Sequence, residues 1–285
     1  NKENPPLKIS PSTGLIGIAY KMPIASAQVK SSILLAGLNA EGKTQVQEKF
    51  PTRDHTERMM KTFEANISFS KGTVEIEKSD LKTPGQIEVP GDFSSAAFFI
   101  GACLISEDSE IKIKNVGINK TRKAFLDCLL DMNANIDLTN IRQLGNEEVA
   151  DLVIKSSDLL PAKIMEDIVP NLIDELPLFF LIASLIEGES EFNGLSELKH
   201  KESDRLSIMI NNLQELDVEV HLNKDSLKII GKKDRIFSDG VFDSHGDHRI
   251  AMTMLVAGLR SSEGLIVKNV DCINTSFPEF IDQAK

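Results

Sequence analysis

Residues 91–105 read GDFSSAAFFIGACLI, and this stretch decides the fold. It opens with polar residues, continues as an apolar run rich in small side chains, and is followed by the acidic turn Glu107-Asp108. A helix that is apolar on most of its faces has to lie inside a protein, where other elements cover it. The stretch therefore predicts a buried helix that begins with a polar residue.

This pattern occurs four times, and the internal repeat is the most informative feature of the chain. The anchors of the copies lie 66, 82 and 73 residues apart and are Ser26, Asp92, Asp174 and Asp247. A spacing of this size indicates one supersecondary unit per copy. Polar groups at the start of several helices favour an anion site if the helix N-termini converge; the alternative is that each polar residue only caps its own helix.

A second helix follows in three copies, beginning near Thr52-Arg53-Asp54, Thr121-Arg122 and Ser203-Asp204-Arg205, and each start opens with a residue type suited to N-capping. Alternation of apolar and polar residues predicts a strand after each second helix, at 67–69, 135–138 and 218–222. A further strand is expected at 74–77 and 227–230. The fold class is therefore α/β, built from α+β repeats, with apolar helices inside and sheets outside.

Composition limits the possible partners. The chain of 285 residues suits about two domains. A net charge of −11, a pI of about 5.0, no Trp and one Tyr argue against nucleic acid and against an anionic membrane surface. No apolar run reaches the roughly 20 residues of a membrane span. Three cysteines without a C-x-x-C pair suit a reducing, cytoplasmic setting.

Three polar clusters are candidates for chemistry: 199–205, 244–249 and 167–177. Each also fits an ordinary helix start. His245 and His248, with Asp247 between them, could suggest a metal site. No further ligand with recognisable spacing follows, so a metal is not expected. Arg249 favours a phosphate or carboxylate instead, because a guanidinium group matches those anions in bidentate geometry.

Together these motifs resemble 5-enolpyruvylshikimate-3-phosphate (EPSP) synthases, the 3-phosphoshikimate 1-carboxyvinyltransferases, over about Gly14 to Phe280. The resemblance is carried by Ala25–Ser31 (ASAQVKS), Thr52–Glu57 (TRDHTE), Lys201–Arg205 (KESDR) and Asp247–Met252 (DHRIAM), which occur in the family's order. It implies the enolpyruvyl transferase fold, in which βαβαββ units form two domains, each an inside-out α/β barrel. Residues 1–90 are then expected to be the end of the first domain. Residues 91–285 are expected to hold three units of the second, the last of which need not be complete.

The chain starts at Asn1 without Met and reads as the C-terminal two-thirds of such a protein. The family's N-terminal part carries a Lys-Ser pair, an Asn-Ala-Gly-Thr loop and two substrate-binding arginines, and none of these motifs is present here. The resemblance therefore implies that this stretch alone is inactive.

The family reaction joins the 5-hydroxyl of shikimate 3-phosphate to C2 of phosphoenolpyruvate and releases phosphate, within the shikimate pathway to chorismate and the aromatic amino acids. The resemblance implies that Asp174 takes the hydroxyl proton and that Glu202 handles the proton at C3, although the two transfers could be shared differently between these carboxylates. It implies no metal or organic cofactor, a cytoplasmic monomer, and small-molecule partners only.

The resemblance also implies the ligand contacts. Shikimate 3-phosphate is expected to bind Ser26, Ala27, Gln28, Arg53, Asp174 and Lys201. Phosphoenolpyruvate is expected to bind Gln28, Arg205, His248 and Arg249.

One position departs from the family pattern. Thr275 stands where some members have a Lys before a Thr/Ser-Phe-Pro segment, which bears on a third phosphoenolpyruvate contact and on the family's inhibitor glyphosate. Two other functions stay open: the sister enolpyruvyl transferase acting on UDP-N-acetylglucosamine, and a non-catalytic substrate-binding domain.

Overall fold

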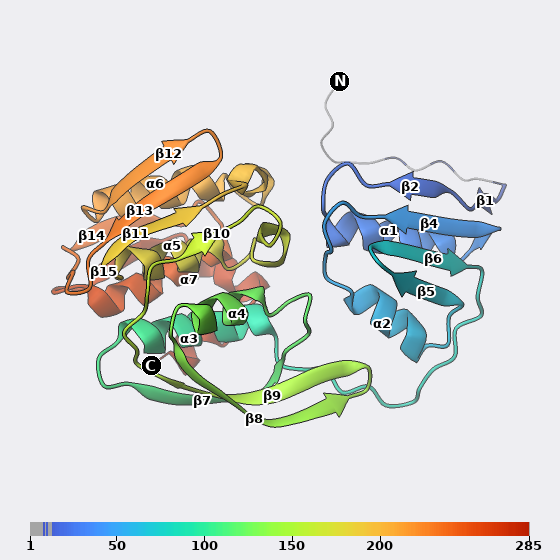
Figure 1. Ribbon diagram of the computed structural model, residues 1–285, viewed down its shortest axis with the longest axis horizontal. Coiled ribbons are helices and arrows are strands. Elements are labelled where there is room, and N and C mark those ends of the chain that lie inside the picture. The colour runs from blue at the N-terminus through green and yellow to red at the C-terminus, as the bar shows by residue number, and fades with distance from the viewer. Residues whose placement is uncertain (1–7, 9, 11–12, 285) are drawn as a thin grey trace. The chain divides into compact units, whose positions relative to one another are not determined.

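The computed structural model describes residues 8, 10 and 13–284. The chain divides into two compact units, unit 1 (Asn1–Ile87) and unit 2 (Glu88–Lys285). Figure 1 colours unit 1 blue to teal and unit 2 green to red. In the part of the chain that the structure describes, no helix is long and apolar enough to cross a membrane.

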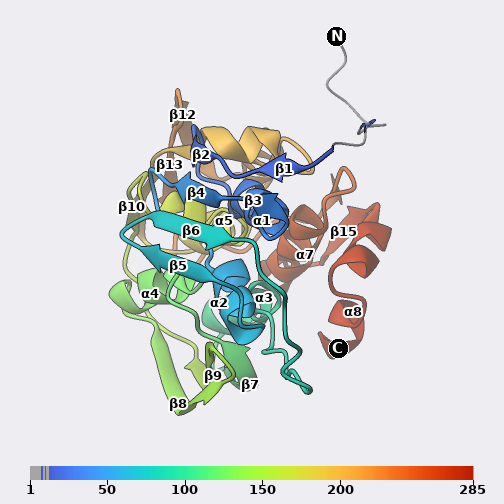
Figure 2. The same ribbon diagram turned by 90° about the vertical axis from the view of Figure 1, so that its right-hand side faces the viewer.

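Unit 1 is a four-stranded sheet with two helices on one face (Figure 2). Its elements are β1 (Leu15–Ile16), β2 (Ala19–Lys21), α1 (Ala27–Gly37), β3 (Ala40–Glu41), β4 (Lys43–Gln47), α2 (His55–Thr62), β5 (Ile67–Ser70) and β6 (Thr73–Glu77). The strand order is β2-β4-β6-β5, with β2 parallel to β4 and the other pairs antiparallel. Val46, Val74 and Ile76 alternate with polar residues and face the helices, where Leu34 and Met60 complete a small core.

Unit 2 holds three further copies of the repeat. The first contains α3 (Phe93–Ile105), β7 (Glu110–Gly117), α4 (Ala124–Asp131), β8 (Asn135–Leu144) and β9 (Glu147–Lys155). The second contains β10 (Lys163–Ile164), η1 (Val169–Asn171), α5 (Leu176–Ser184), β11 (Gly188–Phe192), η2 (Leu195–His200), α6 (Arg205–Glu215), β12 (Glu219–Asn223) and β13 (Ser226–Gly231). The third contains β14 (Gly240–Asp243), α7 (His248–Ala257), η3 (Gly258–Arg260), β15 (Leu265–Lys268), η4 (Val270–Thr275) and α8 (Phe280–Gln283).

Two of the copies share one complete topology, and the third copy of unit 2 has only the parallel pair β14-β15. The order β10-β11-β13-β12 in unit 2 repeats β2-β4-β6-β5 of unit 1, with the same parallel first pair. In the first copy of unit 2 the order is β7-β9-β8, so the first strand of the four is absent. Its place beside β7 is taken by a single parallel bridge between Gly91 and Val116. No sheet among the described residues closes on itself. The βαβαββ unit expected from the sequence is therefore confirmed.

The helices lie inside unit 2 and the sheets outside, as expected. Every residue of α5 is buried, and α3 is buried at ten positions, whereas β8 has exposed residues along its length and β13 alternates buried with half-buried residues. A β-carbon on Gly101 of α3 would lie only 2.9 Å from Leu178 Cδ1 of α5, so glycine allows these two helices to touch closely.

Two details of the sequence analysis are wrong. Thr52, Thr121 and Ser203 do not cap the second helices, because the N-cap positions of α2, α4 and α6 are Asp54, Lys123 and Asp204. Thr52 instead donates a hydrogen bond to Glu48. Strand β9 was not predicted, because its four consecutive buried residues, 149–152, interrupt the alternation that marks a half-buried strand.

Candidate active site

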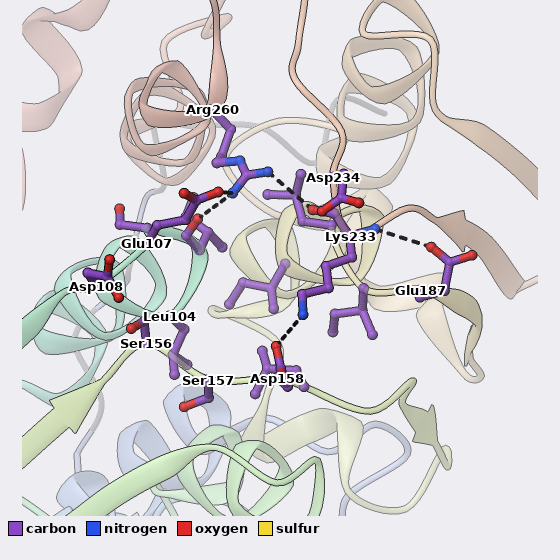
Figure 3. A pocket seen from close by; sticks show the side chains of 16 residues that line it. Leu104, Glu107, Asp108, Ser156, Ser157, Asp158, Glu187, Lys233, Asp234 and Arg260 are labelled. Atoms are coloured by element: carbon purple, nitrogen blue, oxygen red, sulfur yellow. Dashed lines mark hydrogen bonds and ion pairs between the residues drawn. The ribbon is translucent and has the colours of Figure 1, made fainter.

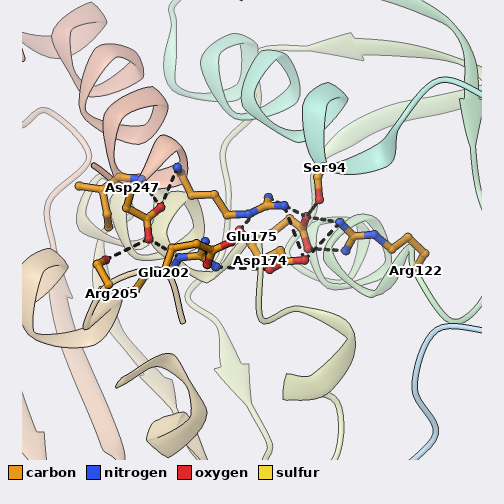
Figure 4. A network of polar contacts seen from close by, with 10 residues as sticks. Ser94, Arg122, Asp174, Glu175, Glu202, Arg205 and Asp247 are labelled. Carbon is orange, nitrogen blue, oxygen red and sulfur yellow. Dashed lines mark hydrogen bonds and ion pairs between the residues drawn. The ribbon is translucent and has the colours of Figure 1, made fainter. Parts of the chain in front are cut away.

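The polar residues at the start of the inner helices of unit 2 meet in one network (Figure 4). The contributing elements are α3, α6, α7 and the segments just before α4 and α5, and the residues are Ser94, Arg122, Asp174, Glu175, Glu202, Arg205, Asp247 and Arg249. Helix N-termini carry free N–H groups and partial positive charge. Their convergence makes this end of unit 2 suited to an anion.

Arg205 is the centre of the network. Its side chain is 0% exposed, and each of the three guanidinium nitrogens contacts a different carboxylate. Nε donates to Asp247 Oδ2 at 2.8 Å, Nη1 to Asp174 Oδ1 at 3.3 Å, and Nη2 to Glu202 Oε2 at 2.5 Å. Since the side chain of Glu202 is 55% exposed, it is the partner of Arg205 that is best able to move.

Asp247 is more than a helix cap. Its Oδ1 accepts from the backbone N–H groups of Arg249 and Ile250, which is the N-capping role expected from the sequence. Its Oδ2 accepts from Arg205 and from the hydroxyl of Ser203. Burial alone would raise the pKa of Asp247, but the hydrogen bond and charge of Arg205 and the cap N–H group hold it below its ordinary value. Asp247 is therefore ionised and anchors Arg205 to α7.

Asp174 lies among three guanidinium groups. Besides Arg205, Nη2 of Arg249 lies 3.6 Å and Nη2 of Arg122 lies 3.8 Å from Asp174 Oδ2. Arg249 also donates from Nη1 to the backbone carbonyl of Asp174 at 3.2 Å. A carboxylate with this many cations nearby is held in place from several sides and stays accessible, with its side chain 13% exposed.

Glu175, the next residue after Asp174, has a buried side chain. Its side chain is 1% exposed and accepts two hydrogen bonds from Arg122, both at 3.0 Å, and one from the hydroxyl of Ser94 at 2.5 Å. Burial raises the pKa of Glu175, and the charges of Arg122 and Arg249 oppose that rise. Neither of the two acidic residues acts as a helix cap: Glu175 occupies the N-cap position of α5 without a side-chain cap bond. The alternative that this acid pair only caps a helix is wrong.

His248 and Lys201 complete the expected residues of unit 2. His248 opens α7 next to the network, and burial together with the charge of Arg249 lowers its pKa, which favours a neutral imidazole at neutral pH. Lys201 follows η2 and directly precedes Glu202. Asp174, Glu202, Arg205, His248 and Arg249 are thus gathered at one end of unit 2.

The remaining expected residues lie in unit 1. Ser26 caps α1 by accepting from the backbone N–H of Val29 at 3.3 Å, and Ala27 and Gln28 form the first turn. Arg53 lies in the segment before α2. The hydroxyl groups of Ser31 and Thr56, 2.6 Å apart, tie α1 to the start of α2.

A buried ionic cluster supports this end of unit 1. Lys30, 1% exposed, contacts Glu57 Oε1 at 2.7 Å and Glu48 Oε2 at 3.1 Å, and it donates to the carbonyl of Thr52 at 3.4 Å. Glu48 also accepts from the backbone N–H of Thr52 at 3.1 Å. The cluster therefore joins α1 to the segment that carries Arg53. No sequence motif indicates this cluster, because its members are up to 27 positions apart in the chain.

Glu57 gives this cluster a pH dependence. Burial raises the pKa of Glu57 above its ordinary 4.5, although Lys30 opposes the rise, and Glu57 Oε2 is buried without a partner. The protonated form is favoured in the folded state, so its contribution to stability is complete below pH 4.5 and is lost as the pH rises through the raised value. As the pH rises through this value, the free energy of unfolding is expected to fall less in Glu57→Gln than in the wild type. Urea denaturation at a series of pH values measures the difference. Parallel curves for the two proteins would contradict it.

Sequence reasoning missed Ser94, Glu175 and Arg122. Arg122 had been assigned only to the start of a helix, although Thr121-Arg122 lies two residues before α4 just as Thr52-Arg53 lies two residues before α2. The repeat was the available signal. Among the described residues, no group of three or more His, Cys, Asp or Glu side chains is arranged to hold a metal ion.

A cavity of about 510 Å³ lies elsewhere in unit 2, at the C-terminal ends of α3 and α5 (Figure 3). Lys233 reaches Asp158 there at 2.5 Å, and Arg260 lies 3.8 Å from Glu107. None of the expected site residues lines it. The polar network and this cavity are therefore at opposite ends of the inner helices.

Comparison with known proteins gives one family. The sequence model of "EPSP synthase (3-phosphoshikimate 1-carboxyvinyltransferase)" matches residues 1–284. The chain is 43% identical over 284 residues to the 3-phosphoshikimate 1-carboxyvinyltransferase of Clostridium tetani, covering 100% of this chain and 64% of the relative. It is 46% identical over 275 residues to that of Magnetococcus marinus, covering 96% and 62%. The chain thus spans less than two-thirds of the length of these curated relatives.

Solved structures agree on the fold. EPSP synthase from Acinetobacter baumannii superposes with a TM-score of 0.86 at 41% identity, covering 95% of this chain and 62% of that one. The enolpyruvyl transferase NikO from Streptomyces tendae gives a TM-score of 0.71 at 16% identity, covering 88% and 56%, which is a likeness of fold alone.

Proposed function

The chain belongs to the EPSP synthase family, and from that premise we propose that the complete protein transfers the enolpyruvyl group of phosphoenolpyruvate to the 5-hydroxyl of shikimate 3-phosphate and releases phosphate. The observation that carries the proposal is the contact of Arg205 with both Asp174 and Glu202, beside Arg249. This arrangement puts two cations for an anionic donor next to two carboxylates for proton transfer.

The proposed donor contacts are Arg205, Arg249 and His248. Phosphoenolpyruvate has a carboxylate and a phosphate, and guanidinium groups bind both kinds of anion in bidentate geometry. Arg205 already has three carboxylate partners, so the ligand takes the place of the exposed partner, Glu202. His248 lies beside Arg249 at the start of α7 and supports the phosphate.

The proposed acceptor contacts are Ser26, Ala27, Gln28 and Arg53 from unit 1, together with Asp174 and Lys201 from unit 2; Gln28 is also proposed as a donor contact. The polar network of unit 2 has four carboxylates against three guanidinium groups. Two phosphorylated substrates therefore need the additional cations Lys201 and Arg53.

The proposed chemistry has two steps. Asp174 accepts the proton of the 5-hydroxyl as its oxygen bonds to C2 of phosphoenolpyruvate, and C3 gains a proton from Glu202 to give a tetrahedral intermediate. The bond from C2 to the phosphate oxygen then breaks, the departing phosphate takes up the proton held by Asp174, and the C3 proton returns to Glu202, so Asp174 ends as the carboxylate and Glu202 as the acid with which each began. The arginines stabilise the negative charge on the donor throughout.

The test is phosphate release by the complete gene product. Phosphoenolpyruvate is supplied with shikimate 3-phosphate or with UDP-N-acetylglucosamine, and only the first acceptor is expected to give phosphate and EPSP. Release with UDP-N-acetylglucosamine alone would assign the sister reaction. Binding of shikimate 3-phosphate without release would show a non-catalytic domain.

We further propose that residues 1–90 and 91–285 belong to two different domains of the complete protein. We also propose that this protein is a cytoplasmic monomer that acts on small molecules, without a nucleic-acid or membrane partner or a cofactor. Family resemblance supports this assignment. Light scattering coupled to size-exclusion chromatography checks the monomer, and a dimer mass would contradict it.

A further inference from the structure

We infer that Arg122 is a positioning residue: by saturating the buried carboxylate of Glu175, it keeps the guanidinium group of Arg249 available for an anionic ligand. This inference rests on the proposed function, in which Arg249 contacts phosphoenolpyruvate.

Arg122 forms an ion pair with Glu175. Its side chain is 7% exposed, Nη1 donates to Glu175 Oε2 and Nη2 donates to Oε1, both at 3.0 Å. This is the bidentate fork that gives the strongest and most directional arginine–carboxylate pairs. Both terminal nitrogens donate to Glu175, and Nη2 also lies 3.8 Å from Asp174 Oδ2, so Arg122 acts through these carboxylates.

Arg249 is the next nearest cation to Glu175. Its Nη1 lies 3.8 Å from Glu175 Oε1, which is too long for a hydrogen bond. The same nitrogen instead donates to the carbonyl of Asp174, and Nη2 lies 3.6 Å from the Asp174 carboxylate. A small movement would convert the contact with Glu175 into a hydrogen-bonded pair.

Removing Arg122 therefore has a directed consequence. Glu175 would be left as a carboxylate that is 1% exposed, with only the hydroxyl of Ser94 as a hydrogen-bond partner. A buried charge without a partner is strongly unfavourable, so Glu175 would take up a proton or draw Arg249 toward itself. In the second case Arg249 turns away from Asp174 and from the ligand.

A rescue experiment in the complete enzyme tests whether Arg249 replaces Arg122 as the partner of Glu175. Arg122→Met is expected to raise the KM for phosphoenolpyruvate about tenfold, in the range of coupling between residues in contact. Arg122→Met combined with Glu175→Gln is expected to recover most of this loss, because glutamine has no charge with which to attract Arg249. Glu175→Gln alone completes the cycle.

A matched control is the adjacent cation. Lys123 pairs with Asp127 on α4 at 2.5 Å instead of with Glu175, so Lys123→Met is expected to leave the KM unchanged. Thermal denaturation of each variant checks folding. If Arg122→Met does not fold, Arg122→Lys with and without Glu175→Gln decides by the same comparison, because lysine cannot form the bidentate pair.

The outcomes separate this inference from the proposed function. A double variant that binds phosphoenolpyruvate no better than Arg122→Met, or a single variant with unchanged KM, overturns the role of Arg122 alone. Calorimetric titration with phosphoenolpyruvate, in saturating shikimate 3-phosphate, repeats the comparison without turnover. If the wild-type protein binds both ligands but releases no phosphate, the proposed reaction is wrong, and calorimetric binding of phosphoenolpyruvate to the variants still decides the role of Arg122. If the wild-type protein does not bind phosphoenolpyruvate, both the proposed reaction and the role of Arg122 are wrong.

Discussion

Asp174→Asn is expected to lower kcat of the complete enzyme by about 10²- to 10⁴-fold, which is the usual contribution of a positioned acid or base. Asparagine has nearly the same shape as aspartate but cannot take the proton of the 5-hydroxyl. The hydrogen bond from Arg249 to the backbone carbonyl of this residue does not depend on the side chain. The fold should therefore persist, and phosphate release under saturating substrates measures the loss.

Two companions make this result specific. Asp137→Asn changes an exposed carboxylate on β8, away from the network, and should leave turnover intact. Glu202→Gln should also lower kcat by orders of magnitude, because the C3 proton then has no carboxylate. Near-normal turnover in both Asp174→Asn and Glu202→Gln would remove the proposed assignment of the proton transfers.

Arg205→Met is expected to have the largest effect on stability, lowering the free energy of unfolding of unit 2 by about 3–5 kcal/mol, as for one partner removed from a buried ion pair. The fully buried Asp247 loses its guanidinium partner, and Asp174 loses one of its three. Turnover should be lost as well, since Arg205 is a proposed donor contact. Urea denaturation of the complete protein, followed by a probe within unit 2, measures the change in stability.

A second substitution identifies the cause of that loss. Asn caps helices about as well as Asp, so Asp247→Asn keeps the start of α7 while removing the buried charge. In the Arg205→Met background it should restore part of the stability, and it should restore no turnover. If the double variant is as unstable as the sum of the two single losses, the stability of this region does not depend on the Arg205–Asp247 pair.

Local sequence patterns were enough to identify most of the inner helices. Apolar runs behind Asp92 and Asp247 predicted α3 and α7, and both residues do cap those helices. The cluster around Arg205 was noticed as the densest run of polar residues, 199–205, but this run also fits an ordinary helix start, and its expected role came from the family resemblance. These features depend on residues close together in the chain, where periodicity and capping preferences act.

The partners across the fold were not predictable in the same way. Glu175 finds Arg122 from 53 positions away and Ser94 from 81 positions away. Such pairs form because the βαβαββ units stack their inner helices with the N-termini at one end, and a single sequence has no signal for which side chains then meet. Thr52 shows the opposite case. It is a residue type that often caps helices, but it donates to Glu48 instead, because a buried carboxylate needs hydrogen-bond donors.

The three carboxylate partners of Arg205 also bear on how the proposed site would respond to dissolved salt. In the proposed site, an arriving anion would exchange one negative neighbour of Arg205 for another, so the affinity gained at this contact would be a difference between two similar ion pairs. Ions in solution screen such enclosed contacts poorly. Changes in ionic strength should consequently alter substrate capture at exposed lysines more than at this buried guanidinium group, and small oxyanions in the buffer should compete mainly by displacing Glu202.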